Sequence, residues 1–178
     1  MGLIYVTGVA GVGKSTALAG LRHRGYEAYG TEEDAIADWI NTSSGIAEEL
    51  PLPGAKFDAH TWFTEHDLVI NYRKVQKLKQ QADEAGKPIF LCGVADGEDK
   101  VWSLFSKVLV LQVDQETLVQ RVQERQDNDF GKTPEELQKI INWNANSQAN
   151  YRQRGAMFID ASQPPEAVLD AIENMADI

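Results

Sequence analysis

A run of eight residues near the N-terminus has the types and spacing needed to bind phosphate. It fits the pattern G-x-x-x-x-G-K-S and consists of Gly8, Val9, Ala10, Gly11, Val12, Gly13, Lys14 and Ser15. Glycines let successive backbone N–H groups approach phosphate oxygens without an intervening Cβ. The lysine can reach the β and γ phosphates of a nucleotide, and the hydroxyl of Ser15 can bind Mg²⁺. The run is a P-loop and predicts a nucleoside triphosphate site, with Thr16 on the α phosphate.

Other nucleotide sites fit the sequence less well. A dinucleotide site needs G-x-G-x-x-G, whereas the glycines here run G-x-x-G-x-G. The guanine-binding pattern N-K-x-D is absent, and the D-x-x-G of residues 83–86 ends a polar helix, where Gly86 is a helix cap. Asp114 follows an apolar strand, as in an ATPase motor, but we favour its role as the N-cap of the next helix.

The elements around the loop are those that a phosphate site at a helix N-terminus requires. An apolar strand at residues 3–6 precedes it, and a helix at 14–24 follows it, so the positive end of the helix dipole faces the ligand. Further strands are predicted at 26–29, 88–91, 108–113 and 157–159, and helices at 32–40, 65–85, 99–105, 115–125, 133–154 and 165–175. The last long helix opens with a capping box at Thr133 and Glu136. Alternating strands and helices predict a parallel sheet covered on both faces.

Composition limits the possible partners. The chain has 178 residues, with 17 Lys and Arg against 27 Asp and Glu, a formal net charge of −10. This charge disfavours general binding to nucleic acid or to anionic membranes, and no stretch approaches a membrane span. A single cysteine, Cys92, excludes an intrachain disulfide. We therefore expect one domain over residues 1–178, cytoplasmic and most simply monomeric.

At this point the chain resembles the P-loop small-molecule kinases of the shikimate, gluconate and nucleoside-monophosphate kinase group. The similarity rests on the P-loop, on residues 30–34 where shikimate-type kinases carry D-T-D, on Cys92-Gly93 after a strand, and on Arg121 and Arg125 before a long helix. The resemblance implies an α/β, three-layer P-loop kinase fold: a five-stranded parallel sheet with helices on both faces and a small lid. It implies transfer of the γ-phosphoryl of MgATP to a small hydroxylated metabolite, with ATP and Mg²⁺ as cofactors.

The resemblance also assigns roles to residues. Arg121 is expected to stack on adenine, and Arg125, in a lid at about 125–133, to reach the phosphates. Alternatively, the two arginines are surface charges favoured by a helix C-terminus. Ala161 and Ser162 lie where the family wraps the adenine base, although Ser162 also suits a helix N-cap. Lys14, Arg125 and Glu32 are the expected catalytic residues.

The acceptor side is less defined by the sequence. Shikimate-type kinases place two aspartates after the second strand, one near Mg²⁺ and one on the acceptor, and this chain has Gly30 and Glu32 there. Gly30 cannot serve a metal, so the Mg²⁺ shell is expected to rely on Ser15, phosphates and water. Glu32 is expected to orient the acceptor hydroxyl; Asp34 is the alternative, and a third possibility is that these acidic residues only cap the next helix. The acceptor-binding segment spans about 32–85, and candidates in this region are Glu32, Asp34, His60, Trp62, His66, Arg73 and Asp96.

One departure from the family concerns the acceptor itself. Shikimate-type kinases bind the acceptor carboxylate with an arginine on the helix after the lid, but here that helix offers Asn142, Asn144, Asn146 and Asn150. Amides suit a neutral polyol, sugar or nucleoside. A nucleoside-monophosphate kinase, and a regulatory module that hydrolyses ATP slowly or not at all, remain the alternatives.

Overall fold

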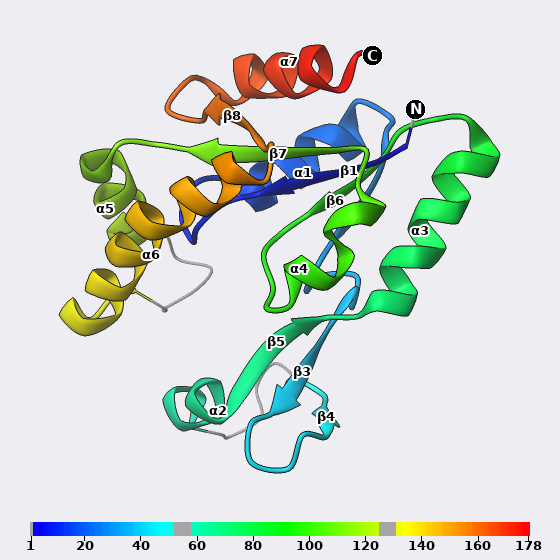
Figure 1. The fold of residues 1–178 in the computed structure, drawn as a ribbon. Helices are drawn as coiled ribbons and strands as arrows, with labels where there is room; N and C mark the ends of the chain where they lie inside the picture. The colour runs from blue at the N-terminus through cyan, green and yellow to red at the C-terminus, as the bar shows by residue number, and fades with distance from the viewer. Residues whose placement is uncertain (1, 52–57, 125–130) are drawn as a thin grey trace.

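The computed structural model describes residues 2–51, 58–124 and 131–178. Its main sheet is parallel and has the strand order β2-β6-β1-β7-β8, with β1 at the centre (Figure 1). These strands are β1 (Leu3–Thr7), β2 (Glu27–Gly30), β6 (Ile89–Cys92), β7 (Lys107–Gln112) and β8 (Met157–Asp160). The helices are α1 (Lys14–His23), α2 (Ala59–Glu65), α3 (Tyr72–Ala85), α4 (Glu98–Val101), the 3₁₀ helix η1 (Trp102–Leu104), α5 (Gln115–Glu124), α6 (Pro134–Gln153) and α7 (Pro165–Ala176). The predicted fold class is therefore confirmed.

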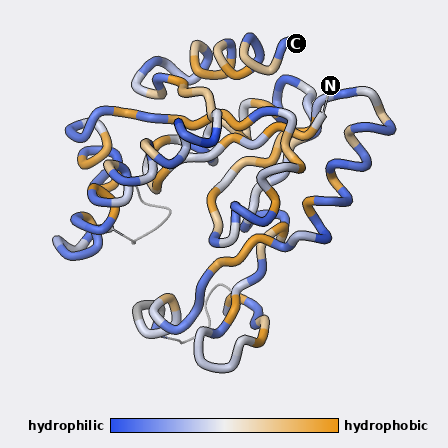
Figure 2. Tube along the Cα trace, viewed as in Figure 1, coloured by the Kyte–Doolittle hydropathy of each residue, from blue (hydrophilic) through white to orange (hydrophobic). Residues whose placement is uncertain are grey.

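Both faces of the main sheet are buried, as its nearly continuous apolar strands predict. Alternate residues of β1 belong to different cores, because successive side chains of a strand point to opposite faces. Ile4 and Val6 pack with α1, α5 and α7, whereas Leu3 and Tyr5 pack with α3 and α4. Figure 2 shows these strands as apolar tracks and the outer turns of the helices as polar. Among the described residues, no helix is long and apolar enough to cross a membrane.

A second, smaller sheet lies outside the predicted architecture. It is antiparallel, has the order β4-β3-β5, and consists of β3 (Ala37–Asn41), β4 (Ala47–Glu48) and β5 (His66–Ile70). Two backbone hydrogen bonds join β5 to the loop after β6, from Ile70 N–H to Asp96 C=O at 2.9 Å and from Asp96 N–H to Leu68 C=O at 2.7 Å. In Figure 1 this sheet projects away from the main sheet, with α2 beside it.

The small sheet corrects two predicted helices. Residues 32–40 form a turn followed by β3, because the Asp34 carboxylate accepts a hydrogen bond from the Gly30 N–H at 2.6 Å and Ala35 has a φ of 51°. Such side-chain-to-backbone bonds compete with a helix. Residues 65–85 divide into β5 and α3, and the side chain of Asn71 caps α3 by accepting from the N–H groups of residues 73 and 74. Segment 42–64, for which the sequence predicts no helix or strand, contains β4 and α2.

A half-buried carboxylate, that of Glu98, connects β1, α4 and α6. Glu98 accepts hydrogen bonds from the hydroxyls of Tyr5 at 2.5 Å and Tyr151 at 2.9 Å, and a long one from Thr7 at 3.4 Å. Burial raises the pKa of Glu98, and the tyrosine hydrogen bonds oppose that rise. The network holds the C-terminal part of α6 against the strand that leads into the P-loop.

Candidate active site

The P-loop joins β1 to α1, and its glycines have positions that side chains could not take. Gly8 has a φ of 142°, and a Cβ there would lie 2.6 Å from the carbonyl oxygen of Leu111. Gly13, at the N-cap of α1, has a φ of 104° and no atom within 4 Å of its Cβ position. The loop is therefore closed on the side of the sheet and open above the start of α1, where its N–H groups can meet an anion.

Lys14 and Ser15 begin α1 and face this open side. The ammonium group of Lys14 donates a hydrogen bond to the carbonyl of Val9 at 2.8 Å, which folds the side chain back over the loop. Both residues line a cavity of about 680 Å³. Its wall also includes Ala10, Gly11, Val12, Gly13 and Thr16, so the predicted phosphate-binding residues, apart from Gly8 and Val9 at the base of the loop, share one cavity.

The opposite wall of the cavity comes from the turn after β2 and the end of β6. Thr31 donates its N–H to the carbonyl of Cys92 at 2.9 Å, and Gly93 donates its N–H to Val6 at 3.0 Å. Gly93 has a φ of 148°, and a Cβ there would lie 1.9 Å from the hydroxyl oxygen of Thr31. This close approach brings Glu32 to the cavity. Burial raises the pKa of the Cys92 thiol to about 12, so it is neutral and not a nucleophile near neutral pH.

The structure separates the three acidic residues of the turn. Glu32 and Glu33 line the cavity. Burial, and secondarily the charge of Glu33, raises the pKa of Glu32. Asp34 is not among the described lining residues, and its carboxylate is held by Gly30 N–H and by Arg22, each at 2.6 Å. No helix begins here, so these residues do not cap one.

Two oxygen donors lie together where Mg²⁺ would accompany a bound nucleotide. The hydroxyl of Ser15 lies 3.4 Å from Oε1 of Glu33, and both residues line the cavity at the N-terminus of α1. Mg²⁺ prefers oxygen ligands and holds them close to octahedral geometry. A hydroxyl and a carboxylate beside a phosphate-binding loop fit this preference.

The far end of the cavity is bounded by α5, by the segment after β8 and by the start of α7. Arg121 lines it and donates a long hydrogen bond to Val12 at 3.5 Å. Ala161 is a lining residue, but Ser162 is not: its N–H and hydroxyl both turn to Asp160, at 2.9 and 2.6 Å. The N-cap of α7 is Pro164, so Ser162 is not the cap either. Gln163, in the same segment as Ala161, also lines the cavity. Sequence reasoning missed further lining residues here, namely Glu124, Pro165, Val168 and Leu169.

Arg125 and residues 126–130 of the predicted lid lie outside the described residues. Residues 131–133 of the predicted lid lead into α6, where the predicted N-cap Thr133 is confirmed. The Thr133 hydroxyl accepts from the N–H of Glu136 at 3.3 Å, and the Glu136 carboxylate accepts from Gly131 at 3.0 Å. The asparagines of α6 are not among the described lining residues of the cavity.

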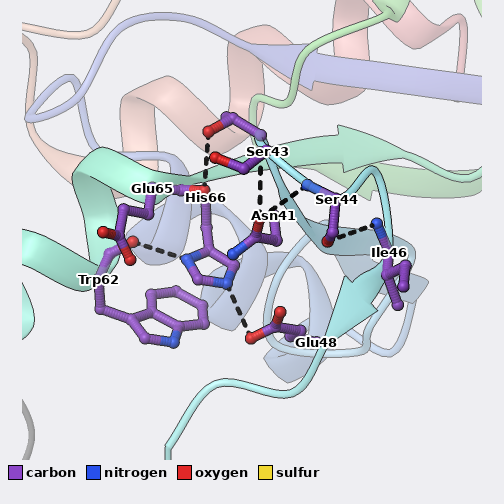
Figure 3. A network of polar contacts seen from close by, with 9 residues as sticks. Asn41, Ser43, Ser44, Ile46, Glu48, Trp62, Glu65 and His66 are labelled. Atoms are coloured by element: carbon purple, nitrogen blue, oxygen red, sulfur yellow. Dashed lines mark hydrogen bonds and ion pairs between the residues drawn. The ribbon is translucent and has the colours of Figure 1, made fainter.

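His66, a candidate from the sequence, belongs to the interior of the small sheet. Its ring stacks on Trp62 with centroids 4.0 Å apart, and its two nitrogens face the Trp62 carbonyl at 2.8 Å and the Glu48 carboxylate at 3.1 Å (Figure 3). Burial lowers the pKa of His66, but these two acceptors raise it above its ordinary value overall. Trp62 also packs edge-on against Trp39. His66 and Trp62 therefore support the sheet, and neither is among the described lining residues.

The remaining candidates lie elsewhere. The side chain of Arg73 is exposed on α3, and the backbone of Asp96 pairs with β5. The side chain of His60 lies outside the described part of the chain. Leu68 of β5 is the contribution of the small sheet to the cavity wall among the described residues.

Comparison with solved structures finds the same architecture in kinases of small molecules. A sugar kinase from a Janibacter species has a TM-score of 0.59 at 20% identity, with 100% of this chain and 95% of that chain covered. Shikimate kinase from Aquifex aeolicus has a TM-score of 0.55 at 18% identity, covering 98% and 96%. A gluconokinase from Sinorhizobium meliloti has a TM-score of 0.54 at 20% identity, covering 99% and 92%.

The kinase group that the sequence resembles is thus the group whose fold this chain has. The comparison with curated protein sequences gives no match. A family model described as an AAA domain, AAA_18, matches residues 4–149, which is most of the chain and includes the P-loop, the acidic turn and Arg121. With this match added to the sheet order and the geometry of the loop, the chain belongs to the AAA_18 family of AAA domains.

Proposed function

We propose that this protein transfers the γ-phosphoryl group of MgATP to a hydroxyl of a small, uncharged acceptor. The observation that carries the proposal is that a single cavity is lined both by the P-loop residues Lys14 and Ser15 and by the acidic residue Glu32. A phosphate-binding loop alone suits any nucleoside triphosphatase. A carboxylate across the same cavity adds a group that can accept a proton from an attacking hydroxyl.

Each residue has a role that its chemistry supports. The N–H groups of the loop and the ammonium of Lys14 bind the phosphates and keep the γ-phosphoryl group in position for in-line attack. Bound Mg²⁺ supplies neutralisation of the charge on the β and γ phosphates. Glu32 accepts the hydrogen bond of the acceptor hydroxyl and orients its oxygen. Its raised pKa favours this role, because a base whose pKa lies closer to the working pH takes up the proton more readily.

The charges of the lining support an uncharged acceptor. In the described lining, the cationic side chains are Lys14 and Arg121, which lie with the P-loop and α5 on the nucleotide side. The acceptor half contains Glu32, Leu68 and Gly93. An acceptor carboxylate or phosphate about 5 Å from Glu32 would meet a repulsion of about 3 kcal/mol at an effective dielectric constant of 20. That energy corresponds to a disadvantage of about 10²-fold in binding.

The experiment is a coupled ADP-release assay on the purified protein with ATP and Mg²⁺. The panel contains neutral acceptors (sugars, polyols and nucleosides) and anionic ones (shikimate, gluconate and nucleoside monophosphates). We expect ADP release to rise above background with a neutral hydroxylated compound and to disappear in Lys14→Ala. A thermal-shift screen of the same panel ranks binding, because a ligand that binds only the folded state raises the apparent stability.

Two outcomes would contradict the proposal. Acceptor-independent ADP release throughout the panel would indicate a nucleotide-hydrolysing module. A preference for an anionic acceptor would mean that a cation outside the described lining serves it, and that the charge argument is wrong.

A further inference from the structure

The carboxylate that shikimate-type kinases place first after the second strand is missing here, and Gly30 stands in its position. In the structure, the space beside Gly30 is filled by the side chain of Glu33. A Cβ on Gly30 would lie 2.1 Å from Oε2 of Glu33, 2.8 Å from its Cδ and 3.0 Å from its Cβ. Gly30 is the last residue of β2 and is not in the left-handed region of φ, so backbone conformation does not require glycine there. A side chain at position 30 would therefore displace the Glu33 carboxylate from the place it occupies.

The other oxygen of this glutamate faces the P-loop. Oε1 of Glu33 accepts a hydrogen bond from the hydroxyl of Ser15 at 3.4 Å, and within the described ranges this is its hydrogen-bond partner. Neighbouring ligands of an octahedral Mg²⁺ ion are about 2.9 Å apart, given metal–oxygen distances of about 2.1 Å. A separation of 3.4 Å therefore suits a carboxylate that shares the ion with Ser15 or accepts from one of its waters.

We propose that Glu33, reaching back from the turn, supplies the carboxylate of the Mg²⁺ site, and that Gly30 is glycine in order to leave room for it. The inference rests on the proposed function, because it concerns the ion that accompanies ATP. It replaces the expectation that Ser15, phosphates and water complete the shell without a protein carboxylate. It also gives each acidic residue of the turn one role. Glu33 binds the metal, Glu32 orients the acceptor, and Asp34 stabilises the turn by accepting a hydrogen bond from the Gly30 N–H.

The test measures metal binding rather than turnover. Mn²⁺ replaces Mg²⁺, and its affinity for the complex of the protein with a non-hydrolysable ATP analogue is followed by electron paramagnetic resonance. Glu33→Ala and Glu33→Gln should each weaken Mn²⁺ binding by about 10- to 100-fold, as expected for a metal-supporting carboxylate. The affinity for the metal-free analogue should stay within about threefold of wild type, because the P-loop contacts are unchanged. Glu27→Gln, which removes the same charge on β2 outside the described cavity lining, is the matched control and should leave Mn²⁺ affinity unaltered.

Gly30 provides an independent arm of the test. Gly30→Ala puts a Cβ where the glutamate lies and should weaken Mn²⁺ binding in the wild-type background but have no further effect in Glu33→Ala. Gly30→Asp combined with Glu33→Ala returns a carboxylate to the same space and should recover most of the lost affinity.

The outcomes distinguish this inference from the proposed function. Mn²⁺ affinity that is unchanged in both Glu33 variants, with the analogue still bound, overturns the inference alone. Equal effects of Gly30→Ala in the two backgrounds show that the two positions act separately and overturn it as well. A wild-type protein that does not bind the analogue at all overturns the proposed function together with the inference.

Discussion

Replacing Gly93 by alanine should damage both the stability and the site of this protein. Two effects add in the folded state. Gly93 has a φ of 148°, which side chains rarely adopt, and such backbone strain costs about 1–3 kcal/mol. The new methyl group would also lie 1.9 Å from the Thr31 hydroxyl oxygen and 2.7 Å from its Cβ, and forced repacking of this kind costs about 1–3 kcal/mol. The free energy of unfolding should therefore fall by about 2–6 kcal/mol in total.

A matched control separates the two effects. Gly25 also has a positive φ, of 86°, but its Cβ position has no atom within 4 Å. Gly25→Ala should therefore show only the backbone term, at the lower end of this range. Urea unfolding followed by circular dichroism measures both variants, and equal m-values would show that the folded states are comparable.

The site should respond as well, because Thr31 precedes the two glutamates that line the cavity. A shift of the turn by about 1 Å is enough to lower kcat/KM by about 10²-fold. The reasoning is refuted if Gly93→Ala is no more destabilised than Gly25→Ala, since the contact with Thr31 would then have no energetic weight. Full activity of a destabilised Gly93→Ala would show that the turn keeps its place.

Four further predictions follow from the site and the core. Lys14→Ala should abolish transfer and weaken ATP binding with an unchanged unfolding midpoint, and an active variant would contradict the P-loop assignment. Glu32→Gln should keep ATP affinity but lower transfer by about 10²-fold or more in steady-state kinetics; activity within a few-fold of wild type would mean that another group orients the acceptor. Arg125→Ala should lower kcat by about 10³-fold or more with little change in nucleotide affinity, and equal modest losses in both would mark it as a surface charge. Glu98 has a raised pKa in the folded state, so its contribution to stability decreases as pH rises from its ordinary pKa of 4.5 through the raised one. Above about pH 4.5 the free energy of unfolding should fall more steeply in wild type than in Glu98→Gln, and parallel curves would contradict this.

The main sheet could be predicted because its signals are local. A continuous apolar run such as residues 3–6 requires a strand buried on both faces, and both faces of β1 are buried. Two helix ends were also predicted correctly. Asp114 accepts a hydrogen bond from the N–H of Thr117 at 2.8 Å, and Gly86 caps α3 with a φ of 61°. In each case the deciding contact lies within a few residues of the signal.

The small sheet could not be predicted in the same way because its pairing is not local. Trp39 pairs with Leu68, so β3 and β5 stabilise each other across an intervening segment that contains another strand and a helix. Residues 32–40 and 65–85 contain enough helix-forming residues to favour helices by themselves, and pairing overrides this preference. One signal was available: Asn71, an N-cap residue type, marks the true start of α3.

The sequence predicts the part of the site that is a contiguous motif. It does not predict the part that depends on which side chains the fold brings to the cavity. The P-loop is contiguous, and its residues meet at the cavity as expected. The loss of a carboxylate at Gly30 was visible in the sequence, but its replacement by Glu33 was not, because it depends on a turn that folds the glutamate back over the glycine. Likewise, the apolar residues of α7 lie far along the chain and reach the cavity only through the packing of α7 against α1.

The small sheet has a consequence for the design of variants of this protein. It carries an aromatic cluster of its own, with Trp39 and Trp62 rings 5.2 Å apart, and it is joined to the loop after β6 through main-chain hydrogen bonds at Asp96. Main-chain bonds tolerate most side-chain replacements, so residues of β3, β4 and β5 can change without disturbing the P-loop. Substitutions in these strands would therefore change the cavity wall through Leu68 while the phosphate-binding loop keeps its geometry.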